Sequence, residues 1–197
     1  LGIIPAIDLA VALVNRAATH GFGATLLPSL ALRAGVPANL RTMIVVPTLL
    51  TTRAALEAQL ERLEVHYLAS VHGELHFALL TDFPDGNAEH LPGDDQLLAT
   101  TVAGIEALNA RYAPGTADRF YLFHRSRRWN ASEGVWMGWE RKRGKIEEFN
   151  RLLRGANDTS FAVRVGAPEI LPHIRYCITL DSDTRLPRDA ARQLIGV

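Results

Sequence analysis

The chain has 197 residues, of which 48% are hydrophobic, and its 21 Lys and Arg residues balance its 21 Asp and Glu residues. This length and apolar content suffice for one substantial hydrophobic core. The balanced charge excludes a generally cationic surface of the kind that coats nucleic acid or an anionic membrane. The one cysteine, Cys177, lies in an apolar run, which predicts a packed thiol and excludes an intrachain disulfide.

The beginning of the chain is apolar: residues 1–14 contain one charged side chain, Asp8, and Asn15 and Arg16 follow them. A stretch this short does not span a bilayer, and no basic region precedes it as in a signal peptide. We therefore expect a packed or interfacial helix, followed by an irregular connection over residues 21–39. The chain starts without methionine and both ends look cut, which indicates a piece of a larger protein.

Strand and helix patterns then alternate along the chain. Short β-branched or aromatic apolar runs predict strands, and longer stretches with one apolar helical stripe predict helices. Alternation of this kind predicts right-handed crossovers and a mostly parallel, doubly wound α/β sheet. The expected strands are residues 42–47, 75–82, 120–124 and a run from Tyr176, and the expected helices are residues 51–69, 94–112 and 145–154.

The connections carry turn-forming residues. Residues 83–93 predict a loop, and residues 156–173 predict a looser connection before the fourth strand. Gly155 is well placed to end the preceding helix. After the fourth strand, Pro187 suits the first position of one more helix.

Polar residues follow three of the expected strands. Pro47 and Thr48 end the first strand, Asp82 ends the second, and Asp181-Ser182-Asp183 follows the fourth. In a sheet ordered 3-2-1-4, the ends of the first and fourth strands flank the topological switch point, with the second strand beside them. The sequence therefore predicts that these polar ends meet at one crevice.

Each carboxylate at this crevice has two interpretations. If the strand stays extended through Ser182, Asp181 and Asp183 point to the same side and suit Mg²⁺ or Mn²⁺ with a diphosphate. Alternatively, the two residues cap the following helix. Asp82 could accept hydrogen bonds from the imide or exocyclic amine of a nucleobase, or it could simply initiate a turn.

Residues 125–145 form a basic and aromatic segment, with seven Arg or Lys residues against two Glu. Lys145 would open the following helix, where a cation can meet phosphate; a solvated basic loop is the alternative. Trp129, Trp136 and Trp139 could form platforms for sugar faces or stacked bases. Alternatively, these rings anchor the segment to the core.

Three strings in the chain resemble the bacterial cyclic β-1,2-glucan synthases, most closely their glycosyltransferase family 84 domain. The string Gly-Val-Trp-Met-Gly-Trp-Glu-Arg-Lys-Arg-Gly-Lys at residues 134–145 is highly specific, whereas Asp-x-Asp is not. The other two are Ile-Val-Val-Pro-Thr-Leu-Leu at residues 44–50 and the stretch around the Asp-x-Asp triplet, residues 178–188.

The resemblance implies a transferase of the GT-A-like fold, of which this chain holds the N-terminal part. It implies inverting transfer of glucose from UDP-glucose to a growing glucan acceptor, with a divalent cation (Mg²⁺ or Mn²⁺) as cofactor. The site residues that it implies are Pro47, Thr48 and Asp82 around the nucleotide, Lys145 at the phosphates, and Asp181 and Asp183 at the nucleotide sugar and metal, with Asp183 the more direct metal ligand.

The resemblance also implies a domain organisation. Residues 1–40 would be an N-terminal helix and connecting segment near the membrane, and residues 41–197 the nucleotide-sugar-binding half of the transferase domain. The parent protein would be a large multidomain synthase of the bacterial inner membrane, with this domain on the cytoplasmic side. Enzymes of this type place their general base and acceptor channel after the Asp-x-Asp motif, so we expect both beyond Val197 and expect the chain alone to be inactive.

Other classes of protein remain open on these residues. A cellulose-synthase-like or other family 2 glycosyltransferase shares the carboxylate pattern, and so does a nucleotidyltransferase. A non-catalytic nucleotide-binding or regulatory module would keep the fold without turnover. Nucleic acid is not an expected partner, because only the basic tryptophan-containing segment favours it.

Overall fold

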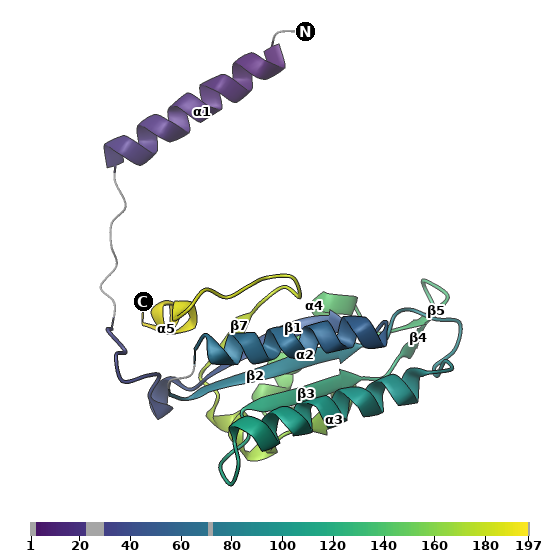
Figure 1. The fold of residues 1–197 in the computed structure, drawn as a ribbon. Coiled ribbons are helices and arrows are strands. Elements are labelled where there is room, and N and C mark those ends of the chain that lie inside the picture. The colour runs from purple at the N-terminus through teal and green to yellow at the C-terminus, as the bar shows by residue number, and fades with distance from the viewer. Residues whose placement is uncertain (1–2, 23–29, 71–72, 197) are drawn as a thin grey trace. The chain divides into compact units, whose positions relative to one another are not determined.

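The structure is a computed structural model of the chain and describes residues 3–22, 30–70 and 73–196. The described residues fall into two units, one that contains α1 (Ile3–Phe22) and one that spans Ala31–Gly196 (Figure 1). The division by contacts follows residue 30, so residues 31–40 belong to the second unit. The reason is Val36, which is buried and forms a β-bridge with Gly73.

The expected N-terminal helix is present as α1, but it continues past Asn15 and Arg16 to Phe22. The side chains described in it, from residue 5 to residue 21, are all exposed. Residues 1–2 of the apolar start and residues 23–29 of the expected connection lie outside the described part. None of the helices in the described ranges is both long and apolar enough to cross a bilayer.

The second unit is built on a five-stranded sheet with the order β6-β3-β2-β1-β7. Four strands are parallel, and β6 pairs with β3 in the antiparallel direction. The mostly parallel α/β sheet and the order of the four expected strands are therefore confirmed. The strands are β1 (Thr42–Leu49), β2 (Leu75–Asp82), β3 (Phe120–Arg125), β6 (Phe161–Val165) and β7 (Tyr176–Thr179).

Short elements of regular structure lie in two segments for which the sequence predicted none. The expected connection of residues 156–173 contains the edge strand β6 and the 3₁₀ helix η2 (Pro168–His173). The basic segment forms a hairpin of β4 (Arg128–Asn130) and β5 (Val135–Met137). These strands are short, so they carry too few residues for a clear alternating pattern.

Helices cover both faces of the sheet (Figure 1). Ile44 of β1 packs with Leu63 and Ile105 on the face of α2 and α3. The next residue, Val45, packs with Phe149 on the face of α4, because successive strand residues point to opposite sides. The helices are α2 (Arg53–Leu68), α3 (Asp94–Tyr112), α4 (Arg141–Leu153) and α5 (Ala190–Ile195), with the 3₁₀ helix η1 (Ala38–Leu40) before β1.

Helix ends follow local signals only in part. Thr52 caps α2 by accepting a hydrogen bond from the backbone N–H of Ala55 at 3.2 Å. Gly155 follows α4 with a φ of 88°, as expected of a helix stop. Pro187 does not open the last helix as expected, because α5 begins at Ala190 after Asp189, whose φ is 61°.

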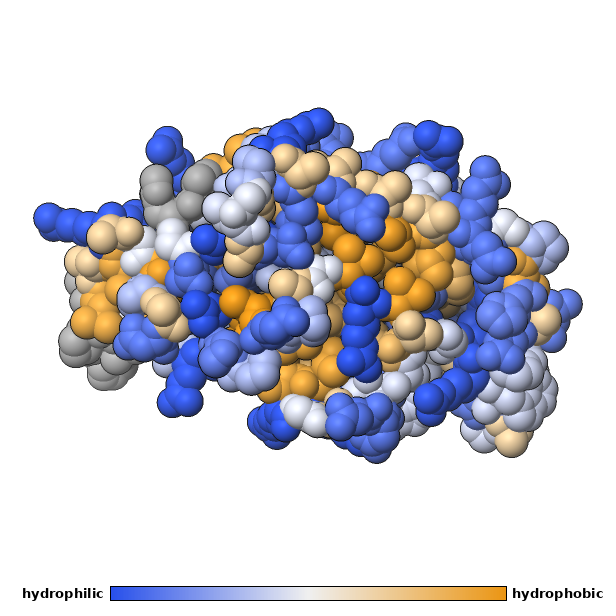
Figure 2. Space-filling model, turned by 90° about the horizontal axis from the view of Figure 1, so that it is seen from below, coloured by the Kyte–Doolittle hydropathy of each residue, from blue (hydrophilic) through white to orange (hydrophobic). Residues whose placement is uncertain are grey.

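One face of the molecule carries apolar surface near its centre, ringed by hydrophilic side chains (Figure 2). A shallow groove between α3 and the edge strand β6 is lined by Leu98, Val102 and Val163, with Asp95 and Glu106 beside them. Apolar side chains between α3 and β6 are therefore partly exposed to solvent along this groove.

Candidate functional site

A cavity of about 590 Å³ lies at the carboxyl ends of β1 and β2. Its lining includes Pro47 and Thr48 from β1, Asp82 from β2, Lys145 from α4 and Ser182 from the segment after β7. The structure thus places Pro47, Thr48, Asp82 and Ser182 at one crevice, whereas Asp181 and Asp183 are not among the residues that line it. This edge of a parallel sheet is where open α/β folds bind ligands.

Asp82 is held beneath the cavity by two cations. Arg125 donates to its carboxylate from Nε at 2.8 Å and from Nη2 at 2.9 Å. The Nζ atom of Lys145 lies 3.1 Å from Asp82 Oδ2. All three side chains are buried, and buried charges are tolerated only when they are paired in this way.

Arg125 is the centre of this buried network. Its Nη1 donates to Glu148 at 3.1 Å and to the carbonyl of Trp139 at 3.1 Å, and its Nη2 donates to the carbonyl of Arg141 at 3.0 Å. Glu148 also accepts hydrogen bonds from the backbone N–H and hydroxyl of Ser160. The sequence analysis counted Arg125 in the basic and aromatic segment and gave it no role of its own. Its position directly after an apolar strand was the available signal.

Lys145 does not open α4 as predicted, because the helix begins at Arg141. Its ammonium group donates to the carbonyl of Thr48 at 2.6 Å and faces Asp82. Burial lowers the pKa of Lys145 to about 8. The side chain is therefore part of the packed base of the cavity.

The early start of α4 depends on a strained backbone. Glu140 and Arg141 have φ values of 51° and 47°, which non-glycine residues seldom adopt. A Cβ atom at Gly144 would lie 2.1 Å from the carbonyl oxygen of Trp139, so the turn requires glycine there. Arg125 stabilises this turn through the carbonyls of Trp139 and Arg141.

Gly138 allows the same segment to approach the carboxylate. A Cβ atom at this position would lie 2.8 Å from Asp82 Cγ and 2.9 Å from Arg125 Nη2. Because Gly138 also lines the cavity, a side chain there would displace the buried ion pair or fill the space above it.

The acidic triplet forms a turn and not the end of a strand. β7 ends at Thr179, and the backbone N–H of Thr184 donates to the carbonyl of Asp181 at 2.9 Å. The condition under which Asp181 and Asp183 would point to the same side, an extended chain through Ser182, is therefore not met. Both Asp181 and Asp183 are exposed.

Side chains of α2 fix the position of this turn. Gln59 Nε2 donates to the carbonyl of Ser182 at 3.3 Å, and Arg62 donates to the same oxygen. Asp181 forms an ion pair with Lys142 of α4. No local sequence pattern indicated Gln59 and Arg62, because these contacts span more than a hundred residues of sequence.

Cations exceed carboxylates around the cavity. Arg141, Lys142 and Lys145 line it together with Asp82 and Asp85, which leaves a formal excess of one positive charge. Arg141 binds Asp85 at 2.9 Å and remains half-exposed. Arg141 and Lys142 belong to the predicted basic run but were not singled out there, because the helix start was placed too late.

The two exposed carboxylates, Asp181 and Asp183, have the oxygen donors that a divalent cation prefers. Within the described ranges, no group of three or more His, Cys, Asp or Glu side chains is close enough to hold a metal ion. Mg²⁺ commonly uses one or two carboxylates and completes its shell with water and phosphate oxygens. Asp181 and Asp183 flank Ser182, which lines the cavity, and Asp181 is paired with Lys142.

The loop of residues 83–93 is present as predicted and is held by a buried arginine. Arg127 donates to the carbonyls of Pro84 at 2.7 Å and Glu89 at 3.1 Å. Arg127 also forms an ion pair with Asp94, and its guanidinium group lowers the pKa of that carboxyl against the opposing effect of burial. The loop that forms one side of the cavity is therefore fixed by the fold.

No family model matches the chain. The chain is similar to cyclic beta-(1,2)-glucan synthase NdvB of Rhizobium meliloti (strain 1021), with 49% identity over 162 residues. The match covers 82% of this chain but 6% of that relative, so the chain spans only a small part of its length. The family resemblance expected from the three sequence strings is confirmed.

Proposed function

We infer that this chain, which is homologous to part of a cyclic β-1,2-glucan synthase, is the nucleotide-sugar-binding part of a glucosyltransferase. In this proposal, the cavity at the ends of β1 and β2 binds UDP-glucose for inverting transfer of glucose to a growing β-1,2-glucan. The observation that carries the proposal is the meeting of Thr48, Asp82, Lys142 and Ser182 around one cavity at the carboxyl edge of the sheet.

The base of the nucleotide is assigned to the side of the cavity formed by Pro47, Thr48 and Asp82. Asp82 Oδ2 faces both Arg125 and Lys145, whereas Oδ1 accepts a hydrogen bond from Arg125 alone among the described residues. A carboxylate oxygen has two lone pairs. Oδ1 therefore keeps the capacity to accept the imide N–H of uracil.

The diphosphate is assigned to Arg141 and Lys142 in place of Lys145. The ammonium group of Lys145 is already buried between Asp82 and the carbonyl of Thr48, whereas Lys142 is half-exposed at the cavity. The N-terminus of α4, which carries a partial positive charge, lies at the same place. Lys145, at the buried base of the cavity, then adds to the positive charge near the diphosphate without contacting it.

Asp181 and Asp183 are the residues that would hold Mg²⁺ or Mn²⁺, which supplies charge neutralisation for a departing diphosphate. Asp181 is paired with Lys142 in this structure. When nucleotide binds, Lys142 turns to phosphate, and the Asp181 carboxylate is released for the cation. The pair thus keeps a phosphate ligand and a metal ligand next to each other.

The proposal also includes the fold, the domain organisation, the partners and the location that the family resemblance implies. The sheet would be the N-terminal part of a GT-A-like fold, with residues 1–40 as the membrane-proximal segment and residues 41–197 as the donor-binding half. The partners would be UDP-glucose, the glucan acceptor and the other domains of a larger synthase. That synthase would lie in the bacterial inner membrane with this domain on the cytoplasmic side.

Calorimetric titration of the chain with UDP, with and without Mn²⁺, tests the proposal. We expect Mn²⁺-dependent binding that is lost in Asp183→Ala and retained in Asp95→Ala, an exposed carboxylate on α3. Absence of UDP binding in the presence of Mn²⁺, or equal loss in both variants, would overturn it.

A further inference from the structure

A second cavity lies between the β4–β5 hairpin and α4, with a volume of about 680 Å³. We propose that this cavity binds a neutral oligosaccharide. Its size falls within the range of roughly 300–1,000 Å³ that is typical of small-molecule sites. Its lining combines open aromatic rings with balanced charged groups, and these two features together select the ligand class.

Two tryptophans present open ring surface at this cavity. Trp129 and Trp139 both line it, with exposed fractions of 55% and 44%. Covering an exposed indole ring with a ligand is favourable, because apolar surface is removed from water. The electron-rich face of the ring also attracts C–H groups, which carry a partial positive charge. The axial C–H faces of pyranose rings are such groups, so a sugar covers the rings without any charge of its own.

The charged residues around the cavity disfavour an anionic ligand. The lining contains three arginines and four carboxylates, which gives a formal net charge of −1. This balance contrasts with the positive excess of the cavity at the ends of β1 and β2. Phosphate or nucleic-acid ligands require excess positive charge, whereas sugar hydroxyls pair with guanidinium donors and carboxylate acceptors alike.

Existing contacts hold these polar groups in place. Arg151 donates to both carboxylate oxygens of Asp158 at 2.6 Å, and Arg141 binds Glu133 at 2.6 Å. The hairpin is attached to the unit by two backbone hydrogen bonds of 2.9 Å between Gly86 and Trp136. Little ordering is therefore required when a ligand binds, which favours affinity.

Arg141 lines both cavities, so a bound saccharide lies next to the cavity at the ends of β1 and β2 and is separate from it. The lining of the second cavity carries this inference, and only the choice of a β-1,2-linked glucan as the first probe rests on the proposed function.

The test is titration of the chain with linear β-1,2-linked gluco-oligosaccharides, followed by tryptophan fluorescence and by the indole N–H signals in NMR spectra. We expect saturable binding that shifts the signals of Trp129 and Trp139. Trp129→Ala should weaken binding about tenfold. Cello- and malto-oligosaccharides form the comparison arms, which show whether the site selects the linkage or neutral glucans in general.

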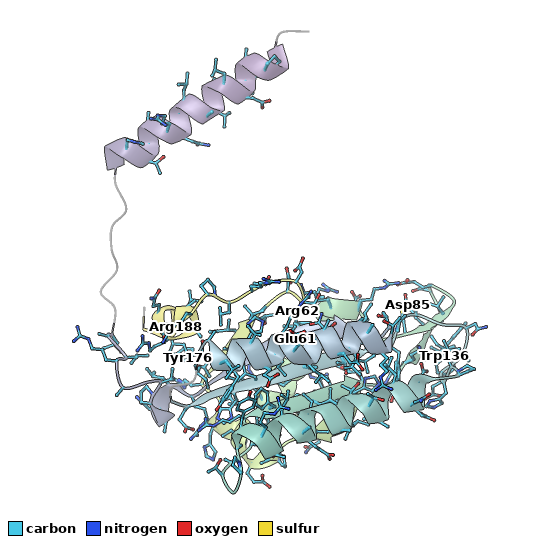
Figure 3. The ribbon with its side chains drawn as sticks, viewed as in Figure 1. Glu61, Arg62, Asp85, Trp136, Tyr176 and Arg188 are labelled. Carbon is cyan, nitrogen blue, oxygen red and sulfur yellow. The ribbon has the colours of Figure 1, made fainter. Side chains whose placement is uncertain are left out.

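Tyr176→Ala is the matched control, because Tyr176 is 46% exposed and lies at the opposite end of the unit from Trp136 (Figure 3). This variant should bind like the unmodified chain. Absence of binding by all three glucan types, or equal loss in the Trp129 and Tyr176 variants, would overturn the proposal. UDP binding is measured separately, so failure here is distinguishable from failure of the proposed function.

Discussion

Arg125 and Asp82 form a two-point ion pair at the base of the cavity, with hydrogen bonds of 2.8 and 2.9 Å from the guanidinium group to the two carboxylate oxygens. Both side chains are buried. The fold itself therefore holds Asp82 in position, and the same arginine supports the turn at which α4 begins.

Replacement of Arg125 by methionine should destabilise the chain by about 3–5 kcal/mol, because Asp82 and Glu148 would remain buried with an unpaired charge. Urea unfolding measures this change. Arg53→Met is the control, since Arg53 and Glu57 form an exposed ion pair whose loss should cost no more than about 0.5 kcal/mol. Similar losses in the two variants would show that the buried network is not a principal source of stability.

Gly138→Ala should destabilise the chain by roughly 1–3 kcal/mol, the usual cost of overpacking. The added Cβ atom would lie 2.8 Å from the carboxylate of Asp82, so UDP affinity should also fall. Gly21→Ala serves as the control, because no atom lies within 4 Å of the added Cβ there. Thermal unfolding and calorimetry check both effects, and an unchanged Gly138→Ala variant contradicts the close approach.

Arg62→Ala should weaken metal-dependent UDP binding several-fold, because the carbonyl of Ser182 loses one of its two donors from α2. Its neighbour Glu61 is exposed (Figure 3), so Glu61→Ala should bind UDP like the unmodified chain. Calorimetry with Mn²⁺ compares the two variants. Equal affinities would mean that the position of the acidic turn does not affect nucleotide binding.

Acid should destabilise the chain partly through His124. Burial lowers the pKa of His124 from 6.5 to about 4, so the unfolded chain binds more protons between these values. This stability is complete above about pH 6.5 and should be lost, by roughly 1–3 kcal/mol, as the pH falls toward 4. Urea unfolding at several pH values measures the loss.

His124→Asn is the matched variant for this pH dependence, because the hydroxyl of Thr81 lies 2.9 Å from His124 Nδ1 and an amide can keep that contact. The variant should lose less stability on acidification. Part of the acid effect should remain, since burial also lowers the pKa of His76 to about 4. An unaltered pH profile in His124→Asn would show that His124 does not contribute.

Elements with strong periodic patterns could be predicted from the sequence. β2 and α3 have the predicted bounds, Leu75–Asp82 and Asp94–Tyr112. The positions of Pro47, Thr48 and Asp82 at one crevice also followed, because the order of parallel strands determines which strand ends are neighbours.

Features that depend on distant contacts could not be predicted. The start of α4 requires positive φ values at Glu140 and Arg141, which are supported by hydrogen bonds from Arg125. The turn at Ser182 depends on donors from α2. Neither contact leaves a periodic pattern in the local sequence. The start of α4 was therefore predicted too late, and the turn at the acidic triplet was not predicted.

The measurement that tests the central claim most directly is the change in backbone amide signals of the ¹⁵N-labelled chain on addition of UDP and Mg²⁺. We expect the largest shifts at Thr48, Asp82, Gly138 and Lys142, which line the cavity at the ends of β1 and β2. Absence of shifts at millimolar UDP, or shifts confined to residues outside that cavity, would contradict the assignment of a nucleotide-sugar site.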